Sequence, residues 1–307
     1  MDSDLDKATG SSSIHFVMSL APLIKQICAI RRKPGLTRKE YMDYRYRIHG
    51  AIVDAPENKD EKPHKYIQTQ VFDSVFGARD GGPLNANQHW FGRDDVTELF
   101  FRDWGHVMRC FTSDYVTGKV GPDGIQFADY ETNIVLMAYE KDLEIATRLA
   151  SRRIELGLDM LQGRATVAQY FISSAEHGTE GEKLEPTLTP LLRAALEQHC
   201  HDDVWGLMAD IGVESDKFDL ASYFGGRDMP RFCLVYKIFL HNHASVPKFR
   251  RSQHSFEDGA QAHFDLNSSF VLFAEEALVM DVDKDIRFAL DRQLTFPDLP
   301  GPTHLQP

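Results

Sequence analysis

The stretch from Ile24 to Phe72 constrains the fold more than any other part of the chain. It begins with a mostly apolar run, Ile24–Ile30, and the turn signal Pro34-Gly35 follows, a pattern typical of a strand that ends in a turn. A helix-like segment and a charged loop come next, and Tyr66–Phe72 then alternates in a way that predicts a second strand. A strand, a helix and a returning strand within fifty residues predict a small sheet with a helix packed on one face.

The helix in this stretch has a clear start and a clear stop. Thr37 followed by Glu40 is a capping-box signature, and Pro56 ends the helix after about Ala55. Residues spaced three and four apart share one face of such a helix. The face predicted to be buried carries Met42, Tyr46, His49 and Val53.

The rest of the chain predicts further elements in a repeated order. Strands are expected at 96–101 and 133–139, with a helix from Asp103 to about Phe111 between them. The first half therefore reads β-α-β-β-α-β, which is a ferredoxin-like unit. A connecting helix is expected at about 143–161. The second half repeats the order less clearly, with strands at 165–172, 204–209, 232–240 and 270–279 and helices at 190–199 and 246–262.

The repeated order predicts an α+β fold class: two tandem ferredoxin-like (βαββαβ) units packed as a pseudo-dimeric α+β barrel. Helices cover one face of each sheet, and the other face of each sheet needs a partner, which the second unit can supply. The predicted boundaries are a disordered leader at 1–20, a first domain at 21–142, a connecting helix at 143–163, a second domain at 164–290 and an irregular tail at 291–307.

Composition excludes several classes of protein. A net charge of −12 argues against a nucleic-acid-binding domain, and the densest basic run, Arg31-Arg32-Lys33, is interpreted as a solvated turn. The four cysteines are far apart and form no Cys-x-x-Cys pair, which favours reduced thiols. The N-terminus, 1–13, lacks the cationic start of a secretory signal, and the run from Phe16 to Ile24 is interrupted by Pro22 and too short to span a bilayer. We expect a cytoplasmic protein with no membrane or nucleic-acid partner.

His49 is the best single candidate for acid–base chemistry. A histidine titrates near neutral pH, and an apolar surrounding would lower its pKa by desolvation. The alternative is a core histidine satisfied by one hydrogen bond. Neighbouring polar groups are expected from one face of the second strand, where Tyr66, Gln68 and Gln70 could hold an oxyanion or enol oxygen, together with Phe72. The alternative for this face is a solvated edge strand.

Two further segments could contribute to a pocket. His89 and Trp90 precede the third strand and could form its mouth, or could simply anchor a loop. Trp104 and His106 lie on the second helix, and the alternative for His106 is a surface histidine. The aromatic side chains expected to shape the cavity are Tyr46, Phe72, Trp90 and Trp104.

Two histidine clusters are candidate metal sites. They are His199-Cys200-His201-Asp202-Asp203 and His241-Asn242-His243, to which His254 or His263 would have to add a ligand. Neither matches a recognised zinc or iron spacing, so no metal is expected. Glycine-rich nucleotide signatures and the Gly-x-Ser-x-Gly elbow are also absent from the sequence, so no cofactor is implied.

The segment from Ile24 to Tyr139 resembles an EthD domain, a branch of the dimeric α+β-barrel superfamily. The resemblance rests on the Arg-Lys-Pro-Gly-Leu-Thr turn at 32–37, the Tyr-rich helix ending in His49-Gly50-Ala51, and the strand Tyr66-Ile67-Gln68. In EthD domains the strand often reads Tyr-x-Gln-x-His, whereas this chain has Gln70 at the histidine position. If that histidine acts as acid or base in relatives, its role would pass to His49, His89 or His106.

The resemblance implies a cofactor-free barrel that acts on small hydrophobic, often polyketide-like molecules. The first hypothesis is a lyase of secondary metabolism that dehydrates, decarboxylates or cyclises its substrate, with His49 and His89 as catalytic candidates. The alternatives are a cofactor-free oxygenase of the anthrone-oxidising kind and a non-catalytic small-molecule-binding barrel. The expected partner is a small hydrophobic substrate, and the chain would be a monomeric pseudo-dimer or a homodimer.

Overall fold

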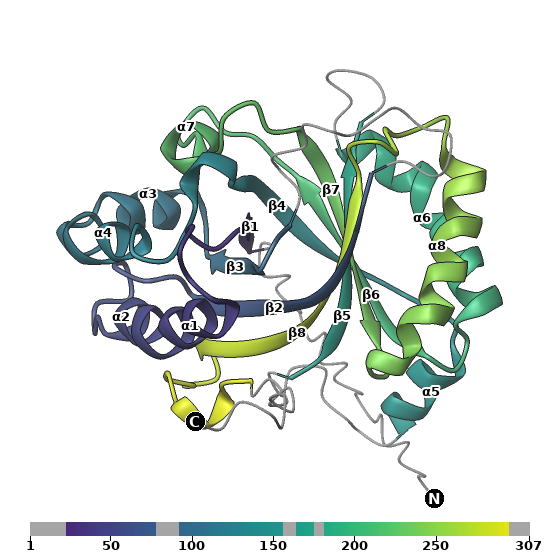
Figure 1. Ribbon diagram of the computed structural model, residues 1–307, viewed down its shortest axis with the longest axis horizontal. Helices are drawn as coiled ribbons and strands as arrows, with labels where there is room; N and C mark the ends of the chain where they lie inside the picture. The colour runs from purple at the N-terminus through teal and green to yellow at the C-terminus, as the bar shows by residue number, and fades with distance from the viewer. Residues whose placement is uncertain (1–22, 78–91, 156–163, 175–180, 295–307) are drawn as a thin grey trace, which may run out of the picture.

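Eight antiparallel strands form one closed barrel in the computed structural model, which describes residues 23–77, 92–155, 164–174 and 181–294 (Figure 1). Around the barrel the strands follow the order β1-β3-β2-β8-β5-β7-β6-β4. Closure gives every strand two hydrogen-bonded neighbours, so the barrel has no open sheet edge. In chain order the strands are β1 (Ile24–Ile30), β2 (Lys65–Phe76), β3 (Asp95–Phe101), β4 (Ile134–Leu143), β5 (Thr166–Ser173), β6 (Val204–Gly212), β7 (Phe232–Leu240) and β8 (Phe270–Asp281).

The two halves of the chain each contribute four adjacent strands. The first half runs β4-β1-β3-β2 across the barrel wall, and the second half runs β8-β5-β7-β6, which is the same internal order. Two seams join the halves, β2 against β8 and β4 against β6. The fold is therefore a mixed α+β structure built on an eight-stranded antiparallel barrel.

Helices cover the outer wall of the barrel in two separate groups (Figure 1). On the side of the first half lie α1 (Arg38–Asp43), the π-helix η1 (Tyr44–Gly50), α2 (Ala51–Asp54), α3 (Trp104–Thr112), the π-helix η2 (Val116–Val120), α4 (Gly121–Gly124), the 3-10 turn η3 (Tyr130–Thr132) and α7 (Leu220–Phe224). On the opposite side lie α5 (Arg148–Glu155), α6 (Gly181–His199) and α8 (Val246–Ala260), and the short turns η4 (His243–Ser245) and η5 (Leu290–Arg292) complete the set. None of the described helices is long and apolar enough to cross a bilayer.

The predicted helix after Thr37 forms where its sequence signals place it. The Thr37 side chain accepts from the backbone N–H of Glu40, and the Glu40 carboxylate accepts from the N–H of Thr37, which completes the capping box. The helical run then continues to Asp54, but its middle, Tyr44–Gly50, is π-helical. π-Helical turns are rare and occur often at functional sites.

Other predicted elements differ in extent. The connecting helix expected from 143 is shorter among the described residues, because β4 continues to Leu143 and α5 covers only Arg148–Glu155. The helix expected at 190–199 starts earlier, at Gly181, and carries Pro186 and Pro190 inside it. Proline ordinarily disfavours a helix interior, which is why the sequence pattern placed the start too late.

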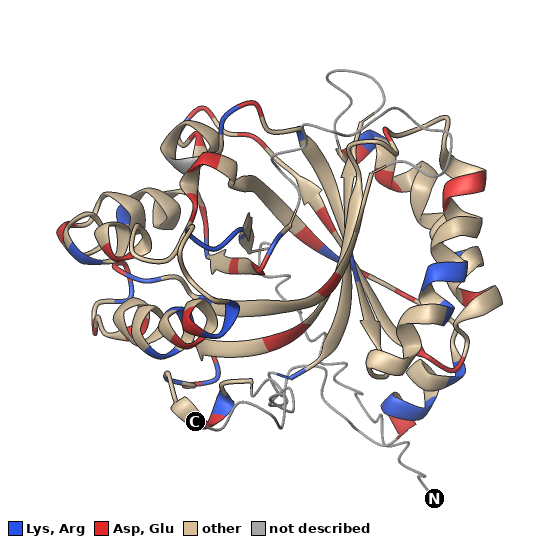
Figure 2. Cartoon of the chain, viewed as in Figure 1, with Lys and Arg blue, Asp and Glu red and all other residues tan. Residues whose placement is uncertain are grey.

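The inside of the barrel holds buried charges that pair with one another. Lys25 lies 2.6 Å from Glu98 and 3.0 Å from Asp210, and Lys237 lies 2.7 Å from Glu98 and also pairs with Glu276. Figure 2 shows these charged positions on the strands that cross the middle of the molecule. Buried charges of this kind are tolerated because each has an opposite partner and hydrogen bonds.

A hydrophobic core fills the space between α6, α8 and the outer face of β5–β8. Side chains from both helices, including Leu188, Leu192, Phe249 and Phe256, pack on Tyr170 and the neighbouring strand residues. On the other side of the barrel the helices stand off from the sheet, and the space between them holds the cavity described next.

Candidate active site

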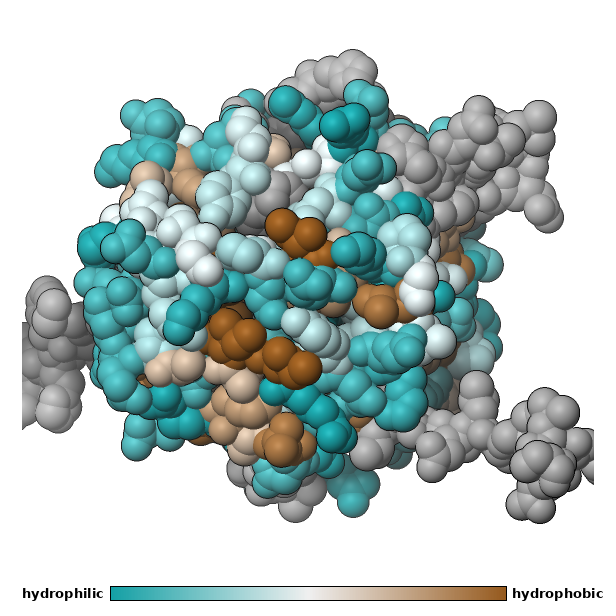
Figure 3. Space-filling model, turned by 60° about the vertical axis from the view of Figure 1, so that its left-hand side comes forward, coloured by the Kyte–Doolittle hydropathy of each residue, from teal (hydrophilic) through white to brown (hydrophobic). Residues whose placement is uncertain are grey.

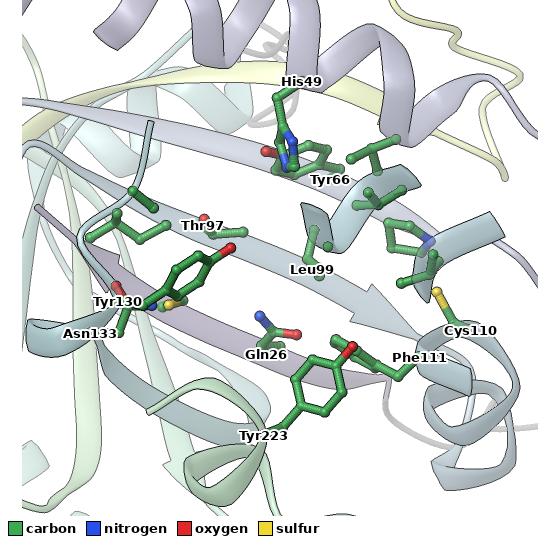
Figure 4. A pocket seen from close by; sticks show the side chains of 18 of the residues that line it. Gln26, His49, Tyr66, Thr97, Leu99, Cys110, Phe111, Tyr130, Asn133 and Tyr223 are labelled. Carbon is green, nitrogen blue, oxygen red and sulfur yellow. The ribbon is translucent and has the colours of Figure 1, made fainter. Parts of the chain in front are cut away.

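A cavity of about 410 Å³ lies between the outer face of the first-half sheet and its covering helices (Figure 4). Strands β1, β2 and β3 form its floor, and η1, α2, α3, η2, α4 and α7 contribute its walls. Most of the lining is apolar or aromatic, as in sites for small hydrophobic ligands. The lining includes Cys28, Ile30, Val53, Leu99, Phe101, Cys110, Phe111, Val116, Val120, Phe127, Tyr130, Asn133 and Tyr223.

The strand register places polar groups in rows across the floor. Gln26 on β1 lies opposite Leu99 on β3, which lies opposite Tyr66 on β2. The next row toward the other end of the sheet joins Cys28, Thr97 and Gln68 in the same way. Because side chains alternate along a strand, both rows point toward the helices and away from the barrel interior.

The π-helical segment directs two basic side chains toward this floor. Arg45 and His49 both line the cavity, and Val53 follows on α2. Residues four apart drift by about 40° around an α-helix of 3.6 residues per turn. Arg45 and His49 therefore lie near one face of the helical run, which is π-helical over 44–50, and both line the cavity.

His49 is held by a carboxylate from a distant helix. Its Nδ1 lies 2.8 Å from Oδ2 of Asp123 on α4, and Oδ1 of Asp123 accepts a hydrogen bond of 2.7 Å from the hydroxyl of Tyr44. The hydrogen bonds from His49 and Tyr44 outweigh the effect of burial and lower the pKa of Asp123, so the carboxylate is ionised and can only accept. The Nδ1 atom of His49 therefore carries the proton, and Nε2 has no hydrogen-bond partner among the described residues.

The surroundings of His49 favour its neutral form. Burial lowers the pKa of His49, the hydrogen bond to Asp123 opposes that shift, and the nearby Arg45 guanidinium adds to it, for a net decrease. The ring also packs edge-on against Phe127, with the ring centres 4.8 Å apart. In Figure 4 the imidazole reaches from its helix into the cavity beside Tyr66. At neutral pH the Nε2 atom is thus an unprotonated base inside a mostly apolar space.

The Tyr66 hydroxyl has a defined polarity. Arg45 donates to it over 3.0 Å and the Gln68 amide donates to it over 2.9 Å. The same Gln68 nitrogen also donates to the backbone carbonyl of Arg45, which fixes the orientation of the amide. Because both neighbours are donors, the hydroxyl accepts twice and its own proton remains available to a molecule in the cavity.

Arg45 carries a positive charge in a fully buried position. Its guanidinium pairs with Asp95, hydrogen-bonds Thr97 and lies 5.4 Å from the centre of the Phe127 ring. Burial would lower the pKa of Arg45, but the carboxylate of Asp95 outweighs burial and raises the pKa, so the group stays charged. The ion pair with Asp95 holds Arg45 in place as a hydrogen-bond donor to the Tyr66 hydroxyl. It also brings positive charge close to the cavity floor.

Two exposed hydrophobic residues mark the rim of the cavity. Ile125 and Tyr223 line it and are still 56% and 46% exposed. In Figure 3, which brings this side of the molecule forward, hydrophobic surface gathers among hydrophilic residues. An apolar rim of this kind suits entry of a hydrophobic molecule.

Several predicted substrate-binding residues lie away from the cavity lining. Tyr46 points toward β8, where its hydroxyl donates to the carbonyls of Leu278 and Ala289, because it lies a quarter turn from Arg45 on the helix. Phe72 stacks on His243 with ring centres 4.0 Å apart, since a register shift between Val71 and Asp73 redirects the end of β2.

The two predicted residues of α3 also serve the packing of the helix. His106 is fully buried instead of lying on the surface, and its Nε2 is 3.0 Å from the carbonyls of both Lys59 and Lys62. The backbone N–H of Arg102 donates to the other ring nitrogen, so both nitrogens are used. Trp104 packs on the hydrophobic cluster around Phe101 and Phe111.

The polar residues of β2 behave differently from one another. Tyr66 lines the cavity, and the Gln68 amide donates a hydrogen bond to the Tyr66 hydroxyl. Gln70 is buried on the same strand face, and its side-chain amide has no hydrogen-bond partner among the described residues. His89 and Trp90 lie outside the described residues.

The described residues contain no group of three or more histidine, cysteine or acidic side chains arranged to hold a metal ion. In the cluster at 241–243, His243 pairs with Glu275, and in the cluster at 199–203, Cys200 forms a hydrogen bond with Ser252. The four cysteines are free thiols, and burial raises the pKa of the cavity thiols Cys28 and Cys110 to about 12, so neither is an available thiolate.

Three site residues escaped the sequence analysis. Arg45 was missed because a charged residue in a helix ordinarily faces solvent. Asp123 lies 74 residues after His49, and no local pattern connects them. Gln26 stands in an apolar strand. Alternation along the strand puts it on the same face as Cys28 and opposite to Ile27, and the strand register puts that face beside Tyr66.

Comparisons with known proteins agree with the sequence resemblance. Residues 33–131, about a third of the chain, match the family model of the EthD domain, which confirms the resemblance over that segment. No curated protein matches the sequence.

Two solved structures are similar to this chain over most of its length. The crystal structure of an anthrone oxidase-like protein aligns with a TM-score of 0.48 and 8% identity, covering 88% of this chain and 97% of that chain. Chlorite dismutase from Candidatus Nitrospira defluvii, in complex with imidazole, aligns with a TM-score of 0.42 and 9% identity, covering 85% and 92%. Neither likeness assigns an activity to this chain.

Proposed function

We propose that the protein is an acid–base enzyme that processes a small, mostly hydrophobic molecule in the cavity beneath η1. The observation that carries the proposal is the 2.8 Å contact between Asp123 and Nδ1 of His49, which leaves Nε2 without a partner among the described residues, in a cavity of about 410 Å³. A base oriented by a carboxylate is a recurring device for proton transfer.

The reaction class that fits these groups is a lyase reaction on an activated carbonyl compound. His49 Nε2 removes a proton from the carbon next to a carbonyl, and the electron pair moves into an enolate. The Tyr66 hydroxyl donates to the enolate oxygen, and its hydrogen bond from Arg45 strengthens it as a donor. The enolate then expels a hydroxyl group from the adjacent carbon, and the protonated His49 returns its proton so that water leaves.

The rest of the cavity supports a flat, hydrophobic substrate of the polyketide kind that the EthD resemblance implies. Aromatic walls such as Phe111, Phe127 and Tyr130 can pack on rings. Gln26 lies on the floor with no side-chain hydrogen-bond partner among the described residues, so it is free to bind a hydroxyl or carbonyl group of the ligand (Figure 4). Decarboxylation of a β-keto acid forms the same kind of enolate by loss of carbon dioxide, and an aldol ring closure starts from such an enolate, so both remain within the proposal.

The same proposal extends to the assembly. We interpret the shared strand order of the two halves as two tandem ferredoxin-like units, so that one chain supplies both halves of the barrel and works as a monomer. In this interpretation the first unit carries the cavity, and the second closes the barrel with its own sheet.

The test combines metabolite profiles with matched variants. An extract from a producing host that lacks the gene is incubated with the protein, and mass spectrometry follows the accumulated precursor. A product lighter than the precursor by water or carbon dioxide, formed without oxygen uptake, is expected. Wild-type protein and His263→Gln, which changes an exposed histidine of the second half, should form it equally, and His49→Gln should be slower by about a hundredfold or more.

Three results would contradict the proposal. Equal product formation by folded His49→Gln protein would remove the histidine from the chemistry. A product heavier by oxygen, with oxygen consumed, would favour the oxygenase reading. Binding of the precursor without any product would favour a binding barrel.

A further inference from the structure

A second hollow, rich in positive charge, lies at the end of the sheet where β1 stops and β3 starts. Its volume is about 500 Å³, and we call it the basic hollow. The register pairs Ile30 with Asp95, and the N–H of Asp94 donates to the carbonyl of Ile30, so the residues after β1 and before β3 are side by side. The lining residues are Arg31, Arg32, Lys33, Pro34, Gly35, Leu36, Gly92, Arg93 and Asp94.

Two glycines shape the loops around the basic hollow. Gly35 and Gly92 have φ values of 95° and 73°, which other residues rarely adopt. Both turns are therefore fixed by the sequence, and they direct basic residues from two segments toward one space.

Carboxylates balance only part of the charge. Arg31 donates from Nε to Asp129 over 2.9 Å, and Arg32 pairs with Asp94. Lys33 is exposed, and its ammonium donates to the backbone carbonyl of Ile125, which carries no full charge. Together with Arg93 the hollow brings four cations against two carboxylates, in a protein whose net charge is −12.

Arg93 is the least balanced of the four cations. It is only 4% exposed, yet no carboxylate among the described residues lies within ion-pair distance of it. Its guanidinium donates to the carbonyls of Thr132, over 2.8 Å, and Gly92, and its Nε has no partner among the described residues. Burial first, and then the neighbouring Arg31, lower the pKa of Arg93 to about 9, which expresses the missing counter-charge.

We propose that the basic hollow binds an oxyanion of the phosphate or carboxylate class, with Arg93 and Lys33 as its main partners. A guanidinium presents a planar fork of donors that matches both kinds of oxyanion, and an anion would supply the charge and the hydrogen bonds that Arg93 lacks. The Arg31-Arg32-Lys33 run, interpreted from the sequence as a solvated turn, is thus part of the proposed anion-binding site.

The position of the basic hollow relates it to the cavity. Arg32 forms a β-bridge with Ala128, and both Ala128 and Ile30 line the cavity. The segments around residues 30–32 and Ala128 therefore lie between the basic hollow and the cavity. The chemistry of the basic hollow does not depend on His49.

The test uses inorganic phosphate as the probe and the full chain. Phosphate is titrated against chloride at matched ionic strength, and binding is followed by the unfolding temperature and by calorimetry. Wild-type protein is expected to show saturable stabilisation by phosphate beyond that by chloride. Arg93→Gln should weaken phosphate binding about tenfold or more, because it removes a charged hydrogen-bond donor. Arg93→Lys should retain part of the affinity.

Two controls keep the result specific. Arg152→Gln removes an exposed arginine on α5 and should bind phosphate like wild type. Because substitution of the buried Arg93 can also affect folding, Lys33→Gln provides the second test at an exposed position and should weaken binding about threefold or more. Acetate is the parallel carboxylate probe, and a response to it that Arg93→Gln removes would equally support the site.

The proposal fails if phosphate and acetate stabilise the protein no more than chloride does. It also fails if Lys33→Gln and folded Arg93→Gln bind like wild type. His49→Gln should keep full phosphate affinity, and loss of binding in that variant would place the anion in the cavity instead.

Discussion

Asp123 and His49 are 74 positions apart in the chain, yet a carboxylate oxygen of Asp123 lies 2.8 Å from Nδ1 of His49. The contact joins α4 to the π-helical segment η1, and Tyr44 completes it from the same segment as His49. It fixes both the orientation and the tautomer of the one histidine among the described cavity-lining residues. Asp123 is therefore a positioning residue, whose removal should alter how His49 titrates.

Asp123→Asn should lower turnover and move the pH profile. Asp123 raises the pKa of His49 against the effect of burial, so its loss should lower that pKa further. The ascending limb of kcat against pH, expected below the ordinary histidine value of 6.5, should then shift to lower pH. Asp123→Glu should restore part of the rate, and Asp114→Asn, at an exposed site nearby, should change neither rate nor profile. An unshifted limb would assign Asp123 a purely structural role.

Tyr66→Phe should lower kcat by about a hundredfold, the scale seen when one oxyanion donor is removed. The ring remains, so the cavity keeps its shape, but the hydroxyl that accepts from Arg45 and Gln68 is lost. Measured kcat and KM for the precursor check this, with Tyr139→Phe, at a half-buried position on β4 outside the cavity lining, as the matched control. Full activity of Tyr66→Phe would show that the hydroxyl only supports Arg45.

The sequence was most informative where a local signal has one structural meaning. The capping box at Thr37 and Glu40 placed the helix start correctly, and the strand expected at 232–240 forms as Phe232–Leu240. Such signals act through hydrogen bonds or alternation within a few residues, so they can be read without the rest of the fold.

The site depended on features that no local signal encodes. Spacings of three and four place both Arg45 and Tyr46 beside His49, and only the packing shows that Arg45 lines the cavity while Tyr46 points at β8. The displacement of Phe72 follows from a register shift against β8, a strand two hundred residues away. Asp123 reaches His49 only after α4 packs on η1. Each error reflects tertiary packing that overrides the local pattern.

Arg45→Met should destabilise the protein by about 3–5 kcal/mol, because it leaves the carboxylate of Asp95 buried without its counter-charge. Urea unfolding monitored by fluorescence measures the change. The double variant Arg45→Met/Asp95→Leu should recover part of the loss, since it removes both charges. Arg47→Met, at an exposed neighbouring position, should cost less than about 1 kcal/mol. If Arg45→Met costs no more than Arg47→Met, the buried pair contributes nothing net.

Asp210→Asn should reduce the pH dependence of stability between about pH 5 and 8. Burial, with Glu140 and Glu98 nearby, raises the pKa of Asp210 to about 7 although Lys25 opposes the shift. Between the ordinary value of 3.8 and about 7, the folded state holds a proton that the unfolded chain releases. The contribution of Asp210 to stability is therefore complete below pH 3.8 and is lost as the pH rises through about 7.

Thermal unfolding at several pH values checks this expectation. Wild-type protein should lose more stability from pH 5 to 8 than Asp210→Asn, because asparagine resembles the protonated acid at every pH. Asp142→Asn, at an exposed position on β4, should follow the wild-type curve. Parallel curves for wild type and Asp210→Asn would mean that Lys25 keeps the carboxylate charged throughout.

The closed barrel affects how amino-acid substitutions can be distributed between its two halves. The seams β2–β8 and β4–β6 join two halves that a single chain encodes separately. In a barrel made from two identical chains, every substitution would occur twice, once on each side of the axis. Here a cavity can be shaped in the first half while α6 and α8 keep their packed core. One gene thus holds two outer walls that can vary separately, and in the proposed function only the first of them has to accommodate a ligand.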